Sequence, residues 1–174
     1  MGQKREGGWL RRISFTELAD GRSTGDGVNH ERRAMMTDTT TPSIECEEFL
    51  PHPPATVWRA MTDPELVARW WAAGDVRAEV GHRFTLDMGA WGLQRCEVLE
   101  VAPERLIRYS FGEGVIDTTI TWTLVPEGAG TRLFLRHEGF DLDSPLGRTA
   151  LEGMGRGWPG VLGAVGRVLT DSSL

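Results

Sequence analysis

Two neighbouring segments in the second half of the chain alternate between inward and outward positions, and this alternation limits the fold more than any other feature. In VIDTTITWTLV, at 115–125, one face carries Ile116, Thr118, Ile120, Trp122 and Leu124. In GTRLFLRHEGF, which follows after a turn, Leu133, Leu135 and His137 share one face. A period of two is typical of β-strands with one covered face. The pair therefore predicts an antiparallel sheet with a buried side.

Further short segments, separated by turn residues, extend this sheet. SIECEEFLP at 43–51 opens the domain as a strand whose inward face the pattern leaves open, and Pro51 ends it. The other strands are expected near 76–80, 83–88, 93–101, 105–111, 115–125 and 131–140. The face of 105–111 also stays open, because Leu106 and Tyr109–Phe111 cannot all point inward without a bulge.

Three helices complete the set of elements. Pro54 and Pro64 occupy first-turn positions of two short helices, PATVWRAMT and PELVARWW. The last helix begins after Ser144, and its apolar stripe comprises Met154, Trp158, Val161 or Leu162, Val165 and Leu169. Pro159 and seven glycines weaken this helix, so packing against the sheet must hold it, and we expect a kink near Gly157–Trp158.

The N-terminal segment shows no sustained periodicity. Residues 1–42 are rich in glycine and charge and contain only short apolar patches, so we expect a disordered extension before the domain at 43–171. Met36 precedes TDTTTPS, and we expect it to be the true initiator.

Charge and hydropathy exclude several classes of function. The net charge of −6 disfavours nucleic acid and anionic membrane surfaces as partners. No apolar run reaches the roughly 18 residues that span a bilayer, and the charged N-terminus lacks a secretory signal. We therefore expect a cytoplasmic protein. A single lysine against eighteen arginines is typical of a high-GC bacterial genome.

The ordered motifs resemble a known superfamily. They are VWRAMTDPELVARWW, GHRF at 81–84, CEVLEVAPERLIRYSF, TTITWTLVPEGAGTRLFLRHEGF and GMGRGWPGVLGAVGRVL. In this order and spacing they resemble the SRPBCC, or START-like, superfamily. Within it they are most similar to the branch related to the C-terminal domain of the activator of the ninety-kilodalton heat-shock chaperone. The resemblance covers about 43–170.

The resemblance implies an α+β helix-grip fold. In such a fold two short helices and a long C-terminal helix accompany a curved antiparallel sheet, and the long helix packs over the concave face. Relatives hold lipids, polyketides, hormones or antibiotics in the cavity between sheet and helix, and one with a similar C-terminal GWP helix protects its producer from an enediyne antibiotic. The segment between Phe84 and Gln94 is short here, which implies a cavity that is small or open at that end.

Aromatic residues and one histidine are the candidate ligand-binding groups. The set comprises Trp70, Trp71, Phe84, Trp91, Tyr109, Phe111, Trp122, His137, Trp158 and Leu162. Each aromatic ring suits either a core or a cavity wall, and Arg108 or Ser110 would add polarity. His137 is a core histidine satisfied by a neighbouring hydroxyl or carbonyl, a ligand-orienting group, or a general acid–base. The four histidines and two cysteines lack ligand spacing, so no metal or cofactor is expected.

Three functions follow from these features. The first is non-enzymatic binding of a small, largely apolar or aromatic molecule for carriage, sequestration or self-protection. The second is cyclase- or lyase-type catalysis on a polyketide-like substrate, with His137 moving protons. The third is a co-chaperone role that stimulates a heat-shock ATPase through contact with the chaperone. The oligomeric state is left open.

Overall fold

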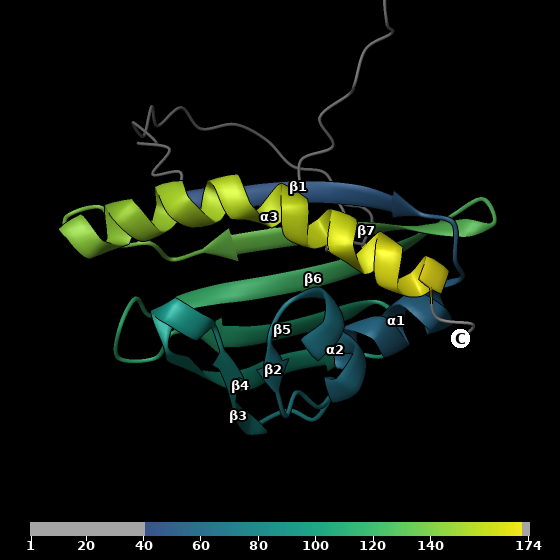
Figure 1. Cartoon of the computed structure of the whole chain (residues 1–174), viewed down its shortest axis with the longest axis horizontal. Helices are drawn as coiled ribbons and strands as arrows, with labels where there is room; N and C mark the ends of the chain where they lie inside the picture. Colours follow the sequence, from purple (N-terminus) through teal and green to yellow (C-terminus); the bar gives the residue numbers. More distant parts are fainter. Residues whose placement is uncertain (1–40, 172–174) are drawn as a thin grey trace, which may run out of the picture. The chain divides into compact units, whose positions relative to one another are not determined.

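Seven antiparallel strands form one curled sheet, and the helices lie across its concave face (Figure 1). The structure, a computed structural model, describes residues 41–171. The expected disorder of the N-terminal segment and the expected start at Met36 fall on residues 1–40, outside the described part. The α+β helix-grip fold is confirmed.

The strands follow the chain order with one exception at the sheet edge. Their bounds are β1 Ser43–Leu50, β2 Ala73–Gly74, β3 Arg83–Asp87, β4 Leu93–Ala102, β5 Leu106–Phe111, β6 Thr118–Glu127 and β7 Gly130–Glu138. The sheet order is β1-β7-β6-β5-β4-β3-β2, so the first strand closes the sheet beside the last.

The alternating segments bury the expected faces. On β6 Ile120 lies opposite His137 of β7, and Trp122 lies opposite Leu135. All four side chains are at most 1% exposed. Both edges of this hairpin are paired, since β1 and β5 flank it. The hairpin therefore forms the centre of the concave wall.

The two faces that the sequence left open are now assigned. On β1 the buried residues are Ile44 and Leu50. On β5 the residues Ile107, Tyr109 and Phe111 point inward with no register shift along their pairing with β6. The irregularity lies instead in β4, between Val98 and Glu100. Because the bulge falls on the neighbouring strand, the regular alternation of β5 is kept.

The convex face of the sheet carries charged pairs. Arg132 contacts Glu127 and Glu47, and Arg83 lies 2.7 Å from Glu97 of the next strand. Such pairs on a solvated face contribute little stability each, about 0–1 kcal/mol. They show that this side of the sheet faces water. A cavity enclosed between the sheet and the helices therefore lies on the opposite, concave side.

Two strand predictions are wrong in part. The segment 76–80 is not a strand; it lies between the two-residue β2 and the start of β3 at Arg83. Asp75 instead forms an ion pair with Arg77, and its carbonyl contacts the ring of His82 at 2.6 Å. These local contacts take the place of the hydrogen bonds that a paired strand would form.

The other correction concerns the start of β6. Residues 115–117 form a turn, because the amides of Val115, Ile116 and Asp117 all donate to the carbonyl of Gly112. Asp117 adopts a positive φ of 46°. A β-strand has negative φ, so β6 begins only at Thr118.

The three predicted helices are present, and the structure adds one short helix that the sequence did not predict. They are α1 Pro54–Thr62, α2 Pro64–Trp70, the short 3₁₀ helix η2 Gly89–Trp91 and α3 Pro145–Asp171. The carboxylate of Asp63 caps α2 by accepting from the amide of Glu65. No helix of residues 41–171 has the length and hydropathy needed to cross a membrane.

Helix α3 continues through Pro159 and follows β1 along its length. A Cβ added at Gly155 would lie 3.9 Å from Ile44, and one added at Gly166 would lie 3.4 Å from Leu50. The helix axis changes direction between its two halves (Figure 1). A kink located at Gly157–Trp158 itself stays a prediction.

Candidate functional site

The two halves of α3 meet different surroundings. From Trp158 onward the helix buries Trp158, Leu162, Val165, Val168 and Leu169. Before Trp158 the only buried residue of the helix is Gly147. The second half therefore seals the core, whereas the first half covers a less filled space.

Indole rings fill the space beneath the second half. Trp122 packs edge-on against Trp70 and Trp158, with ring centres 5.6 and 5.7 Å apart. The Nε1–H of Trp122 donates to the hydroxyl of Tyr109, and that of Trp70 donates to the carbonyl of Ala60. These rings are satisfied core residues, which agrees with the rule that buried polar groups are paired.

His137 lies in this core and belongs to a directional chain of hydrogen bonds. Trp158 donates its Nε1–H to Nδ1 of His137 at 3.1 Å. Nε2 lies 2.8 Å from Oγ1 of Thr118, which donates to the carbonyl of Phe111. Because Nδ1 accepts, the ring proton must sit on Nε2, and His137 is a neutral donor to Thr118.

Burial also opposes a charged imidazole. Desolvation lowers the pKa of His137 from its ordinary 6.5 to about 3. Both ring nitrogens are occupied and the side chain is fully buried. Of the three predicted roles, the geometry fits the satisfied core histidine.

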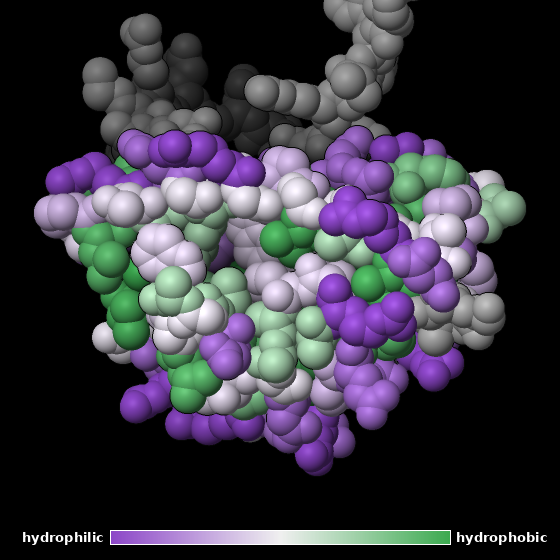
Figure 2. Space-filling model, viewed as in Figure 1, coloured by the Kyte–Doolittle hydropathy of each residue, from purple (hydrophilic) through white to green (hydrophobic). Residues whose placement is uncertain are grey.

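A cavity of about 290 Å³ lies beneath the first half of α3. Figure 2 shows this face hollowed among apolar and weakly polar residues. The lining residues are Trp71, Met88, Trp91, Gln94, Phe111, Val115, Ile116, Leu146, Thr149, Ala150, Gly153, Met154, Gly157, Trp158 and Val161. None of these described lining residues is charged.

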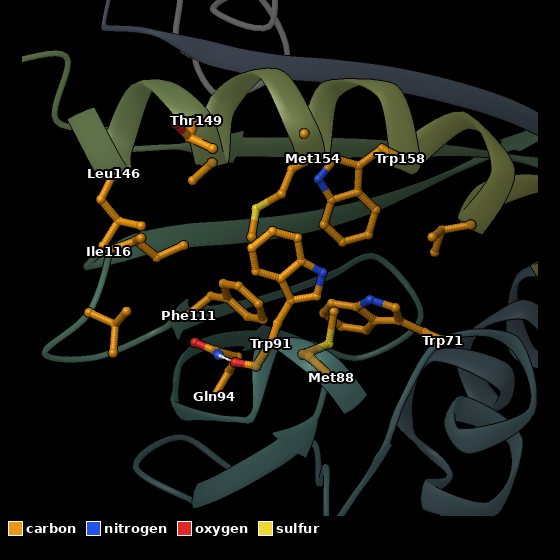
Figure 3. Close-up of a pocket in the computed structure, with 15 residues that line it drawn as sticks. Trp71, Met88, Trp91, Gln94, Phe111, Ile116, Leu146, Thr149, Met154 and Trp158 are labelled. Atoms are coloured by element: carbon orange, nitrogen blue, oxygen red, sulfur yellow. Dashed lines mark hydrogen bonds between the residues drawn. The ribbon is translucent and has the colours of Figure 1, made fainter. Parts of the chain in front are cut away.

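Figure 3 shows the parts of the chain that build the walls. The roof is α3, where Met154 and Trp158 point down from the helix. The inner wall is formed by Phe111 and Trp71, whose rings stack at 5.9 Å. The turn after β5 supplies Ile116 at one end. Trp91 of η2 lies at the rim and is 75% exposed.

Glycines form part of the roof. A Cβ added at Gly153 or Gly157 would meet no atom within 4 Å, and both residues line the cavity. The helix backbone is thus open to the space below. Filling these positions would shrink the cavity without displacing protein atoms.

The ten predicted site residues divide into two groups. Trp71, Trp91, Phe111 and Trp158 line the cavity. The other six, Trp70, Phe84, Tyr109, Trp122, His137 and Leu162, lie in the core and do not line it. Arg108 and Ser110 face away from the cavity, where Arg108 pairs with Glu100 and Ser110 accepts from the amide of Glu97.

Several lining residues were missed from the sequence. Gln94 is the polar position at the start of an inward strand face that continues with Cys96 and Val98. Gly153 and Gly157 occupy a stripe of α3 where a solid core would need large side chains. The short segment from Phe84 to Gln94 supplies two lining residues, the half-buried Met88 and the exposed Trp91 at the rim. The signals available were a polar residue on a buried strand face and small residues on the side of α3 that faces it.

Metal ligands do not gather in the described part. Within residues 41–171 no group of three His, Cys, Asp or Glu side chains is arranged to hold an ion.

Solved structures share this architecture. Protein MLL2253 from Mesorhizobium loti is 32% identical, with a TM-score of 0.66 over 76% of this chain and 99% of that one. CalU16 from Micromonospora echinospora is 29% identical, with a TM-score of 0.60 over 73% and 75%. DynU16, a protein in the dynemicin biosynthetic locus, is 25% identical, with a TM-score of 0.63 over 74% of this chain and 47% of its own.

The family assignment comes from the sequence itself. No curated protein matches the chain at a significant level. A family model described as activator of Hsp90 ATPase homolog 1-like protein matches residues 51–169, which include all three α-helices up to Leu169 and most of the sheet. The chain therefore belongs to the activator of Hsp90 ATPase homolog 1-like family, within the SRPBCC kind of fold.

Proposed function

We propose that this protein binds a small, uncharged, largely aromatic molecule in the cavity beneath the first half of α3. The observation that carries the proposal is the cavity itself, about 290 Å³ in volume and walled by Trp71, Phe111, Met154 and Trp158. Ligand sites are concave and mainly apolar, with a few placed polar groups. The wall matches that description.

The volume limits the size of the ligand. An engineered cavity of about 150 Å³ holds one benzene ring. A space of about 290 Å³ is therefore suited to roughly two fused rings. The open rim at Trp91 leaves room for a larger molecule to extend into solvent.

Binding without catalysis fits the lining better than cyclase chemistry. Proton transfer in a cavity needs a titratable side chain within hydrogen-bond reach of the substrate. The described lining residues include no carboxylate, imidazole, amine or guanidinium. His137 is hydrogen-bonded at both ring nitrogens in the core behind Trp158.

The likeness to DynU16 supports a biological setting. That protein is described as one in the dynemicin biosynthetic locus. By this likeness, the present chain would bind a product or intermediate of natural-product synthesis, for carriage or for protection of the producer.

Thermal unfolding of the protein, followed by calorimetry with and without a two-ring probe, tests the proposal. Naphthalene is uncharged, apolar and of the predicted size. A ligand at ten times its Kd stabilises the protein by about 1.4 kcal/mol, which raises the Tm by roughly 3–6 °C in a domain of this size. Native mass spectrometry of the protein purified from its own host would detect a retained natural ligand as additional mass.

Two results would contradict the proposal. One is an unchanged Tm with naphthalene and with hydroxylated or methylated two-ring probes. The other is turnover of a bound aromatic substrate by the purified protein, which would favour the catalytic alternative.

The family description supports a second candidate, stimulation of a heat-shock ATPase. Exposed apolar residues surround the cavity mouth, including Trp91, Val115 and Leu146. The purified protein would then raise the ATPase rate of the chaperone from the same host. An unchanged rate would remove this candidate.

A further inference from the structure

Gln94 is a buried polar side chain in an apolar wall. It lies on β4 on the same face as Cys96 and Val98, and it is 9% exposed. Its neighbours across the cavity are rings and aliphatic chains. A buried amide needs partners for both its NH₂ group and its oxygen.

One end of the amide is fixed by a main-chain partner. Nε2 of Gln94 lies 2.7 Å from the carbonyl oxygen of Trp91 (Figure 3). A carbonyl only accepts, so the group that faces it must be the NH₂. Oε1 is therefore directed away from Trp91, beside Gly112, where an added Cβ would lie 3.3 Å from it.

The other end of the amide has no hydrogen-bond partner among the described residues. No donor of residues 41–171 forms a hydrogen bond to Oε1 of Gln94. Oε1 is not one of the fully buried side-chain atoms that lack a partner, so it stays accessible at the cavity wall, where a donor on a ligand would hydrogen-bond to it. The cavity is the space from which such a donor can come.

Thr149 is the other neutral polar side chain of the lining. It differs from Gln94 in its hydrogen bonding and in its exposure. Its hydroxyl donates to the carbonyl of Pro145 at 2.9 Å, and the residue is exposed. Its hydrogen is already used within α3. Its oxygen can still accept a hydrogen bond, so Thr149 is the alternative acceptor that the test must separate from Gln94.

The walls add two requirements. Trp71 and Phe111 are nearly parallel, with 24° between their planes, and both line the cavity, so its wall offers aromatic rings to a ligand. A charged ligand would enter this space without a counter-ion, since no described lining residue is charged. A flat and uncharged ring system meets both requirements.

We infer that the ligand is an uncharged fused-ring aromatic molecule with a hydroxyl group, whose O–H donates to Oε1 of Gln94. The inference rests on the proposed function, because it specifies the chemistry of the same cavity. A phenol-like hydroxyl is a donor that stays neutral near pH 7. Gln94 thus selects hydroxylated aromatic molecules over plain hydrocarbons of the same size.

A thermodynamic cycle tests this selection. The Kd values of naphthalene and 2-naphthol are measured by titration calorimetry for the wild type and Gln94→Leu. The ratio of the two Kd values should shift by about tenfold against 2-naphthol in the variant, as expected for one buried hydrogen bond. The ratio cancels effects common to both probes, including any shift of Trp91.

Controls separate the hydroxyl contact from general changes. Thr149→Val tests the other possible acceptor of the lining: a ratio that shifts in this variant and not in Gln94→Leu would show that the ligand hydroxyl binds at Thr149 and that the inference is wrong. Gln94→Met, of similar length, is a second variant without an amide and should repeat the result of Gln94→Leu. 2-Naphthoate should bind at least tenfold more weakly than 2-naphthol, because its carboxylate carries a charge.

The outcomes distinguish the two proposals. If both probes bind and the ratio is the same in wild type, Gln94→Leu and Gln94→Met, the hydroxyl inference is wrong and the binding proposal stands. If 2-naphthoate binds as tightly as 2-naphthol, the requirement for an uncharged ligand is wrong. If neither naphthalene nor 2-naphthol binds the wild type, the proposed function itself is overturned.

Discussion

At the scale of single residues, the chain Trp158–His137–Thr118–Phe111 connects the roof of the cavity to the sheet. Each donor in it has one acceptor, and all the groups are buried. Networks of this kind specify one arrangement of a core, because a partly satisfied network is unfavourable. The orientation of the Trp158 ring against the cavity depends on His137.

Thr118 and Thr123 allow a matched test of this network, since both lie on β6. Thr118→Val removes the partner of His137 Nε2 and should lower the free energy of unfolding by about 1–3 kcal/mol. Thr123 has a buried hydroxyl without a partner, so Thr123→Val should be neutral or slightly stabilising. Urea unfolding of the two variants checks this. Equal losses in both would show that the Thr118 hydroxyl has no special role.

The buried imidazole also predicts a pH dependence. The pKa of His137 is about 3 in the folded state and near 6.5 when unfolded. As the pH falls below 6.5, His137 becomes protonated in the unfolded state but stays neutral in the folded state. The free energy of unfolding therefore decreases with falling pH until about pH 3, where the folded state is protonated as well. From pH 7 to pH 5 the contribution of this group is a loss of about 2 kcal/mol. Urea titrations of wild type and His137→Gln should differ by that amount, and parallel pH profiles would contradict it.

At the scale of elements, α3 is one helix with two environments. Its second half packs against the core, whereas its first half leaves a gap above Phe111 and Ile116. Glycine is destabilising within a helix. Its presence at 153 and 157 is explained by the cavity, where Cβ atoms would intrude.

The start of α3 has a different kind of glycine. A Cβ at Gly147 would overlap the carbonyl oxygen of Asp141, whereas one at Gly160 would meet no atom within 4 Å. Gly147→Ala should therefore destabilise the protein by about 1–3 kcal/mol. Gly160→Ala should instead stabilise it by about 0.5–1 kcal/mol. Thermal unfolding of both variants tests this, and a stabilised Gly147→Ala would mean that the first turn moves freely.

Most elements could be predicted because their signals are local. The alternation of Ile120 and Trp122, and the prolines that open α1 and α2, each identify an element without knowledge of its neighbours. The segment 76–80 could not be predicted, because contacts of Asp75 with Arg77 and His82 decide its path. The turn at 115–117 depends on a single carbonyl, that of Gly112, which accepts three amides.

At the scale of the whole molecule, the candidate site was only partly predictable. Alternation shows that Trp122 points inward and leaves the direction of Phe111 open. It does not show that Trp122 contacts other indoles while Phe111 faces a cavity. That difference depends on how far α3 stands from the sheet at each point along its length. It is a property of the assembled domain, and a single strand pattern does not contain it.

The central claim is that open space beneath the first half of α3 holds a guest, and a glycine pair on that helix tests it most directly. Leucine at 157 would fill the cavity, whereas leucine at 160 would point away from its lining. Both changes replace a helical glycine, so both should raise the Tm to a similar extent.

The decisive measurement is the Kd of 2-naphthol for the wild type, Gly157→Leu and Gly160→Leu by titration calorimetry. We predict that Gly160→Leu binds as the wild type does and that Gly157→Leu, although folded and no less stable, loses at least tenfold in affinity. Equal affinity in all three proteins would show that the guest does not lie beneath α3.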